Sequence, residues 1–439
     1  MQKPPSRILH TATITLAIVA AFLVGYQLRG TGHLTPVWAA QAGIDDTPSV
    51  KPLELFEDAF TKVQHDYVDK IKDPNELAYG AIRGMLATIH DPYTRFMDPK
   101  EYKDFEEQTE GQFAGIGATL NMNAIPNAAT NTTGDTSKDI ICPVCGTNLS
   151  KIQDFQVTIV KPLPGSPAEK AGLLAGDVIA KVDDFVTEGK TLDEVVGKIR
   201  GPEGTPVTLT ITRKGVEKPL ALTITRAIVD VPATEHKILD GNIGYLRLYS
   251  FNEKTVPEST QVLKSFNEAH VRGLVLDLRG DPGGLLTECR KEAGLFLPAK
   301  DTVIVTTKGR NRKAEDETRL ADQLYTGPMV VLVDKGSASA SEILTGALMD
   351  YHRAKSYGET TFGKALVQQV ETLGDPYHPC AMPVTIAHYY TPSGYDLQKR
   401  GITPDVTVPL DKTVKETNDT DNQAQVALKA LKELIVTDK

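Results

Sequence analysis

Apolar residues at helical spacing characterise the chain ahead of residue 109. Leu53, Phe56 and Phe60 recur at three- and four-residue steps, which is typical of one face of a helix. Asp91-Pro92 interrupts the pattern, as a turn between helices does. We therefore predict a helical N-terminal segment at residues 43–109.

Short β-type runs follow, from Gly115 to about Arg226. They are rich in Val and Ile and are separated by Gly, Pro and Asp turns, as around Val178 to Val182. The pattern predicts a small sheet module, which we place at residues 110–226. Within it, residues 121–154 are rich in Asn, Thr and Gly and poor in large apolar groups, so we expect a mobile insertion in a loop.

After residue 240, strand-like and helix-like runs alternate. This alternation predicts an α/β domain with a largely parallel sheet buried on both faces, which we place at residues 227–413. Two of its strands end in glycine-rich turns that open helices, at Arg279–Gly284 and Lys335–Ser341, and open sheets place their chemistry at such ends. A charged amphipathic helix at Val426–Ile435 is expected in the C-terminal segment 414–439. The expected strands are Ile243–Leu248, Leu274–Leu278, Val303–Val305 and Val330–Val333, and the expected helices are 255–270, 285–297 and 341–351.

The composition is that of an ordinary globular chain of 439 residues, long enough for roughly two to four domains. It contains 48 Lys and Arg against 57 Asp and Glu, for a net charge of −9, and no basic block. That balance argues against nucleic-acid binding. Four cysteines are too few for a disulfide scaffold.

The N-terminus carries an export signal. Lys3 and Arg7 precede a long apolar stretch at residues 8–28, and the small residues of Val37–Ala42 follow after a gap. The stretch approaches the length that spans a bilayer, so we favour an uncleaved signal anchor over a cleaved signal peptide within residues 1–42. The positive charges hold that end in the cytoplasm. The remainder of the chain is then extracytoplasmic, in a periplasmic setting, and anchored in the inner membrane.

Ser339 is the first candidate for chemistry. It lies where a buried strand gives way to a helix, so its hydroxyl is expected at the strand tip near unpaired N–H groups. The amide of Ala340, with that of Gly283 or Gly284 on the neighbouring turn, could stabilise an oxyanion. The competing interpretation of the Ser-Ala-Ser-Ala-Ser run is a helix cap with small packing residues.

A lysine is the candidate base, because none of the nine histidines falls in a serine-hydrolase signature. Lys364 lies among apolar residues that could keep its amine neutral, and Gln368 follows at a spacing that could hold the amine in place. A solvated surface lysine is the alternative. Asp350, three helical turns beyond Ser339, is expected to be a structural or orienting carboxylate rather than the base.

Cys142 and Cys145 form half of a zinc-ribbon signature within the expected insertion. The second half is missing, so we predict no metal site. A local disulfide, an incomplete or intersubunit metal site and a vestigial knuckle remain open.

Taken together, these segments resemble the carboxyl-terminal processing peptidases, the tail-specific serine proteases of the Ser/Lys type. The resemblance implies that Ser339 is the nucleophile, Lys364 the general base and Gln368 its orienting partner. It implies a crotonase/ClpP-like layered sheet for the core and a PDZ domain at residues 110–226, and no cofactor. The motifs that carry it occur in the family's order: His90–Phe96, Gly115–Ala118, Gly165–Ile179, Asp277–Gly284, Ser337–Ile343, Phe362–Lys364 and Gly401–Val406.

The expected PDZ module supplies a peptide-binding prediction. The loop Gly115-Ile116-Gly117-Ala118 can offer free amides to a chain-terminal carboxylate, and the following strand edge, to Leu120, can pair with the substrate's last residues. Ile116 and Leu120 would favour apolar tails. The insertion at residues 121–154 departs from the family pattern and is expected to gate or alter this access.

Two further departures lie near the expected active site. Ala365 stands where the family usually has glycine, and Asp281 stands where asparagine is more usual. Both changes are small in size, so the Ser/Lys pair should remain intact.

We therefore expect an extracytoplasmic serine endopeptidase that cleaves proteins with unfolded, apolar C-termini. The alternative from another class is an inert PDZ scaffold that binds such tails; the presence of both Ser339 and Lys364 counts against it. A His-dependent PDZ protease would need a motif set that is not found in the sequence. By resemblance, a regulatory adaptor is a further expected partner, beside the membrane and the protein substrates.

Overall fold

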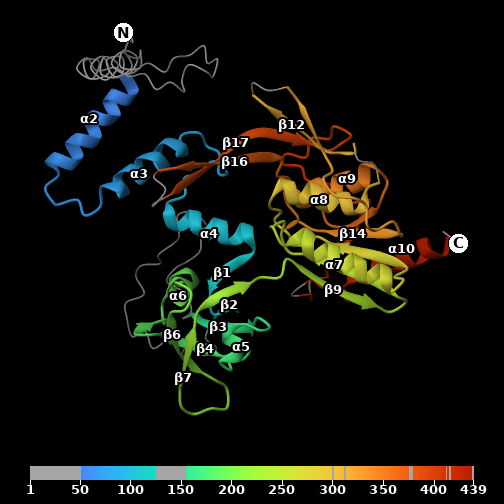
Figure 1. Cartoon of the computed structure of the whole chain (residues 1–439), viewed down its shortest axis with the longest axis horizontal. Helices are drawn as coiled ribbons and strands as arrows, with labels where there is room; N and C mark the ends of the chain where they lie inside the picture. The colour runs from blue at the N-terminus through green and yellow to red at the C-terminus, as the bar shows by residue number, and fades with distance from the viewer. Residues whose placement is uncertain are drawn as a thin grey trace, which may run out of the picture. The chain divides into compact units, whose positions relative to one another are not determined.

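The computed structural model describes residues 51–124, 155–298, 301–310, 313–374, 379–411, 413–414 and 417–437 (Figure 1). It divides into two compact units, Met1–Ala78 and Tyr79–Lys439. The helices expected in the N-terminal segment are present as α2 (Lys51–Asp66), α3 (Pro74–Ala87) and α4 (Pro99–Glu110).

The expected anchor at residues 8–28 lies outside the described residues. Within the described ranges, we find no helix with the length and apolar character that a membrane crossing requires.

A six-stranded sheet forms the centre of the second unit, in the order β18-β15-β14-β11-β10-β9. All neighbouring strands are parallel except β9, which pairs antiparallel with β10 at one edge. Every residue of β11 and β14 is buried, because both faces of the sheet are covered by helices. The prediction of a largely parallel, doubly covered sheet is confirmed. The strands are β9 (Thr234–Leu239), β10 (Ile243–Leu248), β11 (Gly273–Asp277), β14 (Met329–Val333), β15 (Lys355–Gly358) and β18 (Val406–Thr407).

The two faces of this sheet pack against different helices. Leu274 and Leu276 of β11 belong to a core that includes α7 (Thr255–Glu268), α8 (Leu286–Phe296) and α9 (Ala340–Asp350). Val275 points the other way, into a smaller core under α10 (Asn422–Thr437). Because successive side chains point to opposite faces and both faces are buried, these strands are continuous apolar runs in the sequence.

A second, antiparallel sheet was not predicted. Its order is β13-β12-β17-β16, and its strands β16 and β17 are separated from β14 by helix α9 in the sequence. The short run at Val303–Val305 was the only part expected as a strand. The strands are β12 (Val303–Gly309), β13 (Glu315–Thr318), β16 (Leu366–Leu373) and β17 (Cys380–Tyr390).

The module at residues 110–226, expected to be a PDZ domain, is an antiparallel sheet in the order β2-β3-β4-β6-β7, with β5 paired to β4. Its N- and C-terminal ends are joined by a ribbon of β1 (Gln112–Gly115) and β8 (Ala227–Asp230). Asn121 to Ala124, which the expected insertion includes, pair with β3 as part of β2; residues 125–154 of the expected insertion lie outside the described residues. The elements are β2 (Ala118–Ala124), β3 (Phe155–Pro162), α5 (Pro167–Lys170), β4 (Val178–Val182), β5 (Phe185–Val186), α6 (Leu192–Ile199), β6 (Pro206–Thr212) and β7 (Leu220–Thr225).

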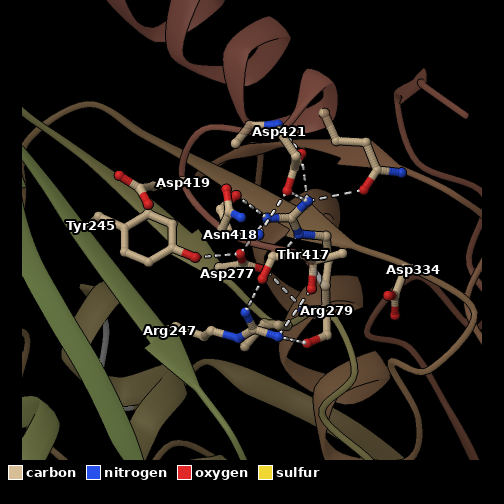
Figure 2. Close-up of polar contacts among 12 residues, drawn as sticks. Tyr245, Arg247, Asp277, Arg279, Asp334, Thr417, Asn418, Asp419 and Asp421 are labelled. Carbon is tan, nitrogen blue, oxygen red and sulfur yellow. Dashed lines mark hydrogen bonds and ion pairs between the residues drawn. The ribbon is translucent and has the colours of Figure 1, made fainter. Parts of the chain in front are cut away.

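The C-terminal helix α10 is longer than expected, and one face of it is part of the core. Ala427, Leu431 and their neighbours are buried against the central sheet. Arg279, only 1% exposed, holds the start of this helix: its guanidinium lies between Asp277 and Asp421, at 2.6 and 2.7 Å (Figure 2). Because Arg279 opens one of the two glycine-rich turns, the same side chain ties the C-terminal segment to the sheet end where chemistry was expected.

Candidate active site

A cavity of about 480 Å³ lies at the carboxyl ends of the central strands, between the two glycine-rich turns and the second sheet. Residues from many separate parts of the second unit line it, including the segment before α4 and the start of β16. The sequence-predicted residues that the structure brings to this cavity are Gly283, Gly284, Ser339, Ala340, Lys364 and Gln368.

Ser339 stands at the start of α9 in a strained backbone conformation. Its φ is 55° and its ψ −113°, outside the regions that a serine ordinarily adopts. Its N–H donates to a carboxylate oxygen of Glu342 at 2.9 Å, and its side chain is half-buried at the cavity. The turn therefore presents the hydroxyl at the helix N-terminus, where the local field favours negative charge.

Glu342 is the residue that sequence analysis missed. It is fully buried, and one carboxylate oxygen accepts the N–H groups of Ser339 and Lys364, both at 2.9 Å. The other oxygen accepts the Thr361 hydroxyl at 2.6 Å and the Gly363 N–H at 2.7 Å. Burial raises the pKa of Glu342, against the hydrogen bonds that it accepts. A glutamate three residues after a serine N-cap is a signal that could have identified it.

Lys364 precedes β16 in the loop that Glu342 holds. Burial lowers the pKa of its amine, while the carboxylates of Asp91 and Glu342 act in the opposite direction. Its Nζ atom lies 4.6 Å from the centroid of the Tyr93 ring. The Tyr389 hydroxyl donates to the backbone carbonyls of both Lys364 and Ser339, at 3.2 Å for the latter. The two loops are thus tied to each other by Glu342 and by Tyr389.

Gln368 lies on β16, directly after an irregularity in its pairing with β17. Its amide nitrogen donates to the Thr385 hydroxyl at 3.2 Å. The structure thus brings Lys364 and Gln368 to the same cavity, and it anchors Gln368 on the neighbouring strand.

The two glycine-rich turns are in close contact beside Ser339. A Cβ atom built on Gly283 would lie 2.6 Å from the Ala338 carbonyl oxygen and 2.8 Å from the Ala340 nitrogen, so only glycine fits there. The N–H of Gly283 is already used, because it donates to Asp281 at 2.8 Å. The oxyanion role expected for Gly283 therefore needs correction, and Gly284, the other expected donor, also lines the cavity.

Two carboxylates near these turns differ in placement. Asp281 is fully buried behind the cavity, and burial raises its pKa to about 8. Asp350 is the last residue of α9, about 16 Å along the helix from Ser339, and accepts the Ser393 N–H at 2.8 Å. Asp350 therefore has a structural contact away from the cavity, which it does not line.

The expected peptide-binding residues lie on β1, β2 and the turn between them. Gly117 has a φ of 74°, and a Cβ atom there would lie 2.5 Å from that of Ser166. Ile116 is 2% exposed and belongs to the module's core, so it does not offer a surface to a tail as expected. Ala118 and Leu120 are half-buried on β2, which is the outer strand of its sheet. Gly115 closes β1 and is buried.

No group of three or more His, Cys, Asp or Glu side chains that could hold a metal is found in the residues that the structure describes. Cys142 and Cys145 lie outside those residues. Cys289 and Cys380 are buried.

Comparisons with known proteins agree with this architecture. Residues 242–408 match peptidase family S41, residues 158–213 match a PDZ domain, and residues 33–101 match the N-terminal domain of the activating protease CtpB. A carboxy-terminal-processing protease of Bartonella bacilliformis is 40% identical over 373 residues, which cover 83% of this chain and 77% of that protein. Carboxy-terminal processing protease CtpA of Bacillus subtilis is 34% identical, with 95% and 83% coverage.

Further similarity is found in a cyanobacterial protein and in a solved structure. A carboxyl-terminal-processing protease of Synechocystis is 36% identical over 84% of this chain and 80% of that protein. A crystal structure from Bacteroides fragilis, provisionally assigned to the S41 proteases, has a TM-score of 0.52 at 16% identity, covering 92% of this chain and 99% of that one. This structural similarity supports the fold described above.

Proposed function

Because the chain belongs to the carboxyl-terminal-processing serine proteases of peptidase family S41, we propose that it cleaves unfolded proteins near apolar C-termini with Ser339 as nucleophile and Lys364 as general base. One observation carries the assignment of residues. Ser339 and Lys364 line the same cavity, and a single buried carboxylate, that of Glu342, accepts the backbone N–H of each. Two separate loops are thus held together at the two residues that the proposed reaction needs.

The chemistry begins with the neutral amine of Lys364, which burial favours. The amine takes the proton of the Ser339 hydroxyl as its oxygen attacks the carbonyl carbon of the substrate, and a tetrahedral oxyanion forms. The ammonium then gives this proton to the leaving amine, and the peptide bond breaks. Water, deprotonated by the same lysine, hydrolyses the acyl-enzyme and returns Ser339 and the neutral amine.

The oxyanion needs donors that are already in place. The Ala340 N–H lies at the first position of α9, next to Ser339. Gly284 replaces Gly283 in the proposal, because Gly283 donates to Asp281. The side-chain amide of Gln368 is held by Thr385, so its carbonyl oxygen is left to orient the lysine amine.

Substrate capture is assigned to the PDZ module. Strand β2 is the outer strand of its sheet, so its free edge can pair with an extended C-terminal segment. The turn at Gly117 precedes this strand and is the proposed position for the terminal carboxylate. Leu120, half-buried on β2, favours an apolar side chain in the tail.

The location of the reaction follows from the N-terminal sequence. The apolar stretch at residues 8–28, preceded by Lys3 and Arg7, supports an anchor in the inner membrane with the protease on the periplasmic side. A regulatory adaptor that acts on the PDZ module is part of the same proposal.

The test compares full-length variants purified in detergent. Wild type, Ser339→Ala, Lys364→Ala and the exposed-lysine control Lys355→Ala receive an unstructured peptide with an apolar free C-terminus, or its amidated twin. We expect cleavage by wild type and Lys355→Ala only, and slower cleavage of the amide. Cleavage by Ser339→Ala would refute the assignment of Ser339 as the nucleophile. Binding of the tail without cleavage by any of the four proteins would favour the inert scaffold.

A further inference from the structure

The segment between α3 and α4 forms one wall of the cavity. Met97 pairs with Ala381 of β17 through two backbone hydrogen bonds of 2.8 and 3.0 Å, and the Arg95 N–H donates to the Pro383 carbonyl at 3.3 Å. These bonds fix the segment on the second sheet. As a result, Tyr93, which comes from a part of the chain about 270 residues before the lysine, lines the cavity with Ser339 and Lys364.

The Tyr93 ring faces the amine of Lys364. The 4.6 Å between Nζ and the ring centroid lies within the range of a cation–π contact, in which the negative face of the ring attracts an ammonium. The backbone of Tyr93 is fixed as well, because its N–H donates to the Asp91 carboxylate at 3.0 Å. The backbone that carries the ring is therefore held in place by its own segment rather than by the lysine.

Asp91 connects the same segment to Gln368. It accepts the Thr94 hydroxyl at 2.7 Å, and Thr94 in turn accepts the Thr385 N–H at 3.0 Å. Asp91 is thus linked through Thr94 to Thr385, whose hydroxyl accepts from Gln368 and also helps to lower the pKa of Asp91. Burial opposes ionisation of Asp91, but these hydrogen bonds outweigh it and lower its pKa, so the carboxylate keeps its charge near the lysine.

We propose that Asp91 and Tyr93 are positioning residues for the reaction: Tyr93 holds the amine of Lys364 through its ring face, and Asp91 holds Gln368 through Thr385. This inference rests on the proposed Ser339–Lys364 pair. Its consequence is that the active site is completed by the N-terminal helical region. The groups that face the lysine are the carboxylates of Asp91 and Glu342 and the ring of Tyr93.

The proposal makes a signed prediction for the pH dependence. The ring face and the Asp91 charge both stabilise the ammonium form, so removing either should let the lysine lose its proton at lower pH. We expect the acid limb of kcat/KM to move to lower pH by about 0.5 to 1 unit in Tyr93→Leu. We also expect a plateau kcat that falls about tenfold or more, because the amine is less well placed.

The experiment uses the full-length protein and the free-acid peptide described above. Tyr93→Phe keeps the ring, so the acid limb of its kcat/KM profile should match that of wild type. Asp91→Asn should shift the acid limb in the same direction as Tyr93→Leu. Phe185→Leu is the matched control, because it removes a ring that contacts Lys190 and Lys198 in the PDZ module, away from the cavity. The acid limb of the Phe185→Leu variant should not move.

An unchanged or upward-shifted limb in Tyr93→Leu would overturn the proposal, as would a Tyr93→Phe variant that behaves like Tyr93→Leu. If a variant is too inactive for kinetics, the titration of Lys364 is followed by NMR in the Ser339→Ala background, where the same shift is expected. Failure of the proposed function would look different: Lys364→Ala would cleave, or wild type would show no acid limb.

Discussion

Glu292, in the middle of α8, should make the stability of this protein decrease as the pH rises. The side chain is fully buried, and neither carboxylate oxygen has a hydrogen-bond partner in the described part of the chain. Burial raises its pKa to about 8; the nearby Ser259 hydroxyl opposes this shift, and the carboxyl groups of Glu288 and Asp281 reinforce it. A buried carboxyl group in this position is expected to be protonated at neutral pH.

The sign and size follow from proton linkage. Between the unfolded pKa, about 4.5, and the folded pKa, about 8, the folded state holds a proton that the unfolded state has lost. The unfolding free energy that Glu292 contributes is therefore greatest below the unfolded pKa and falls by about 1.4 kcal/mol per pH unit across that window. From pH 5 to pH 7 the loss is about 3 kcal/mol.

The assay is urea unfolding of full-length wild type and Glu292→Gln at several pH values. Glutamine keeps the size but cannot ionise, so the difference between the two unfolding free energies should change by about 1.4 kcal/mol per pH unit in favour of the variant as the pH rises. Asp281 gives both proteins a pH dependence of the same sign, and this contribution largely cancels in the difference between their unfolding free energies. The control is Glu268→Gln, an exposed position on α7, which should give a difference that is flat with pH. A flat difference for Glu292→Gln as well would refute the argument.

Three further outcomes are expected. Arg279→Met should lower the unfolding free energy measured in urea by about 3–5 kcal/mol, because two buried carboxylates lose their partner, and a loss below 1 kcal/mol would contradict this. Gly117→Ala should weaken binding of the free-acid tail because of the Ser166 contact and the positive φ, whereas Gly165→Ala, with a similar φ but open space, should bind nearly as wild type in the same titration. Cleavage should decline as the pH falls through the depressed pKa of Lys364, and a rate that stays constant on acidification would exclude a lysine base.

Much of the fold could be predicted because local patterns carry it. The apolar runs of β10, β11 and β14 are strands whose two faces are both buried, and glycine-rich turns follow β11 and β14. The helical spacing before residue 109 predicted α2 to α4. Ser339 could be placed at a strand-to-helix junction for the same reason, since that junction is a feature of adjacent residues.

The second sheet was missed because, apart from Val303–Val305 in β12, its strands lack such patterns. Most of β16 is exposed or half-buried, so it shows no continuous apolar run, and its stability comes from pairing with β17. The expected placement of Ile116 failed for a related reason. An apolar residue in a loop can point toward a ligand or into the core, and only the packing of the module on Ser166 and α5 decides between them.

By itself, the sequence determined the order of the domains, the buried strands and the residue types that the reaction needs. Only the tertiary structure decided how these residues meet. Glu342 joins the loops of Ser339 and Lys364 through backbone N–H groups. The three-residue spacing from Ser339 is a local signal for the first bond, but nothing in the sequence marks the N–H of Lys364, because such groups occur in almost every residue. Tyr93 reaches the same lysine because its segment pairs with β17, a long-range contact that local propensity does not encode.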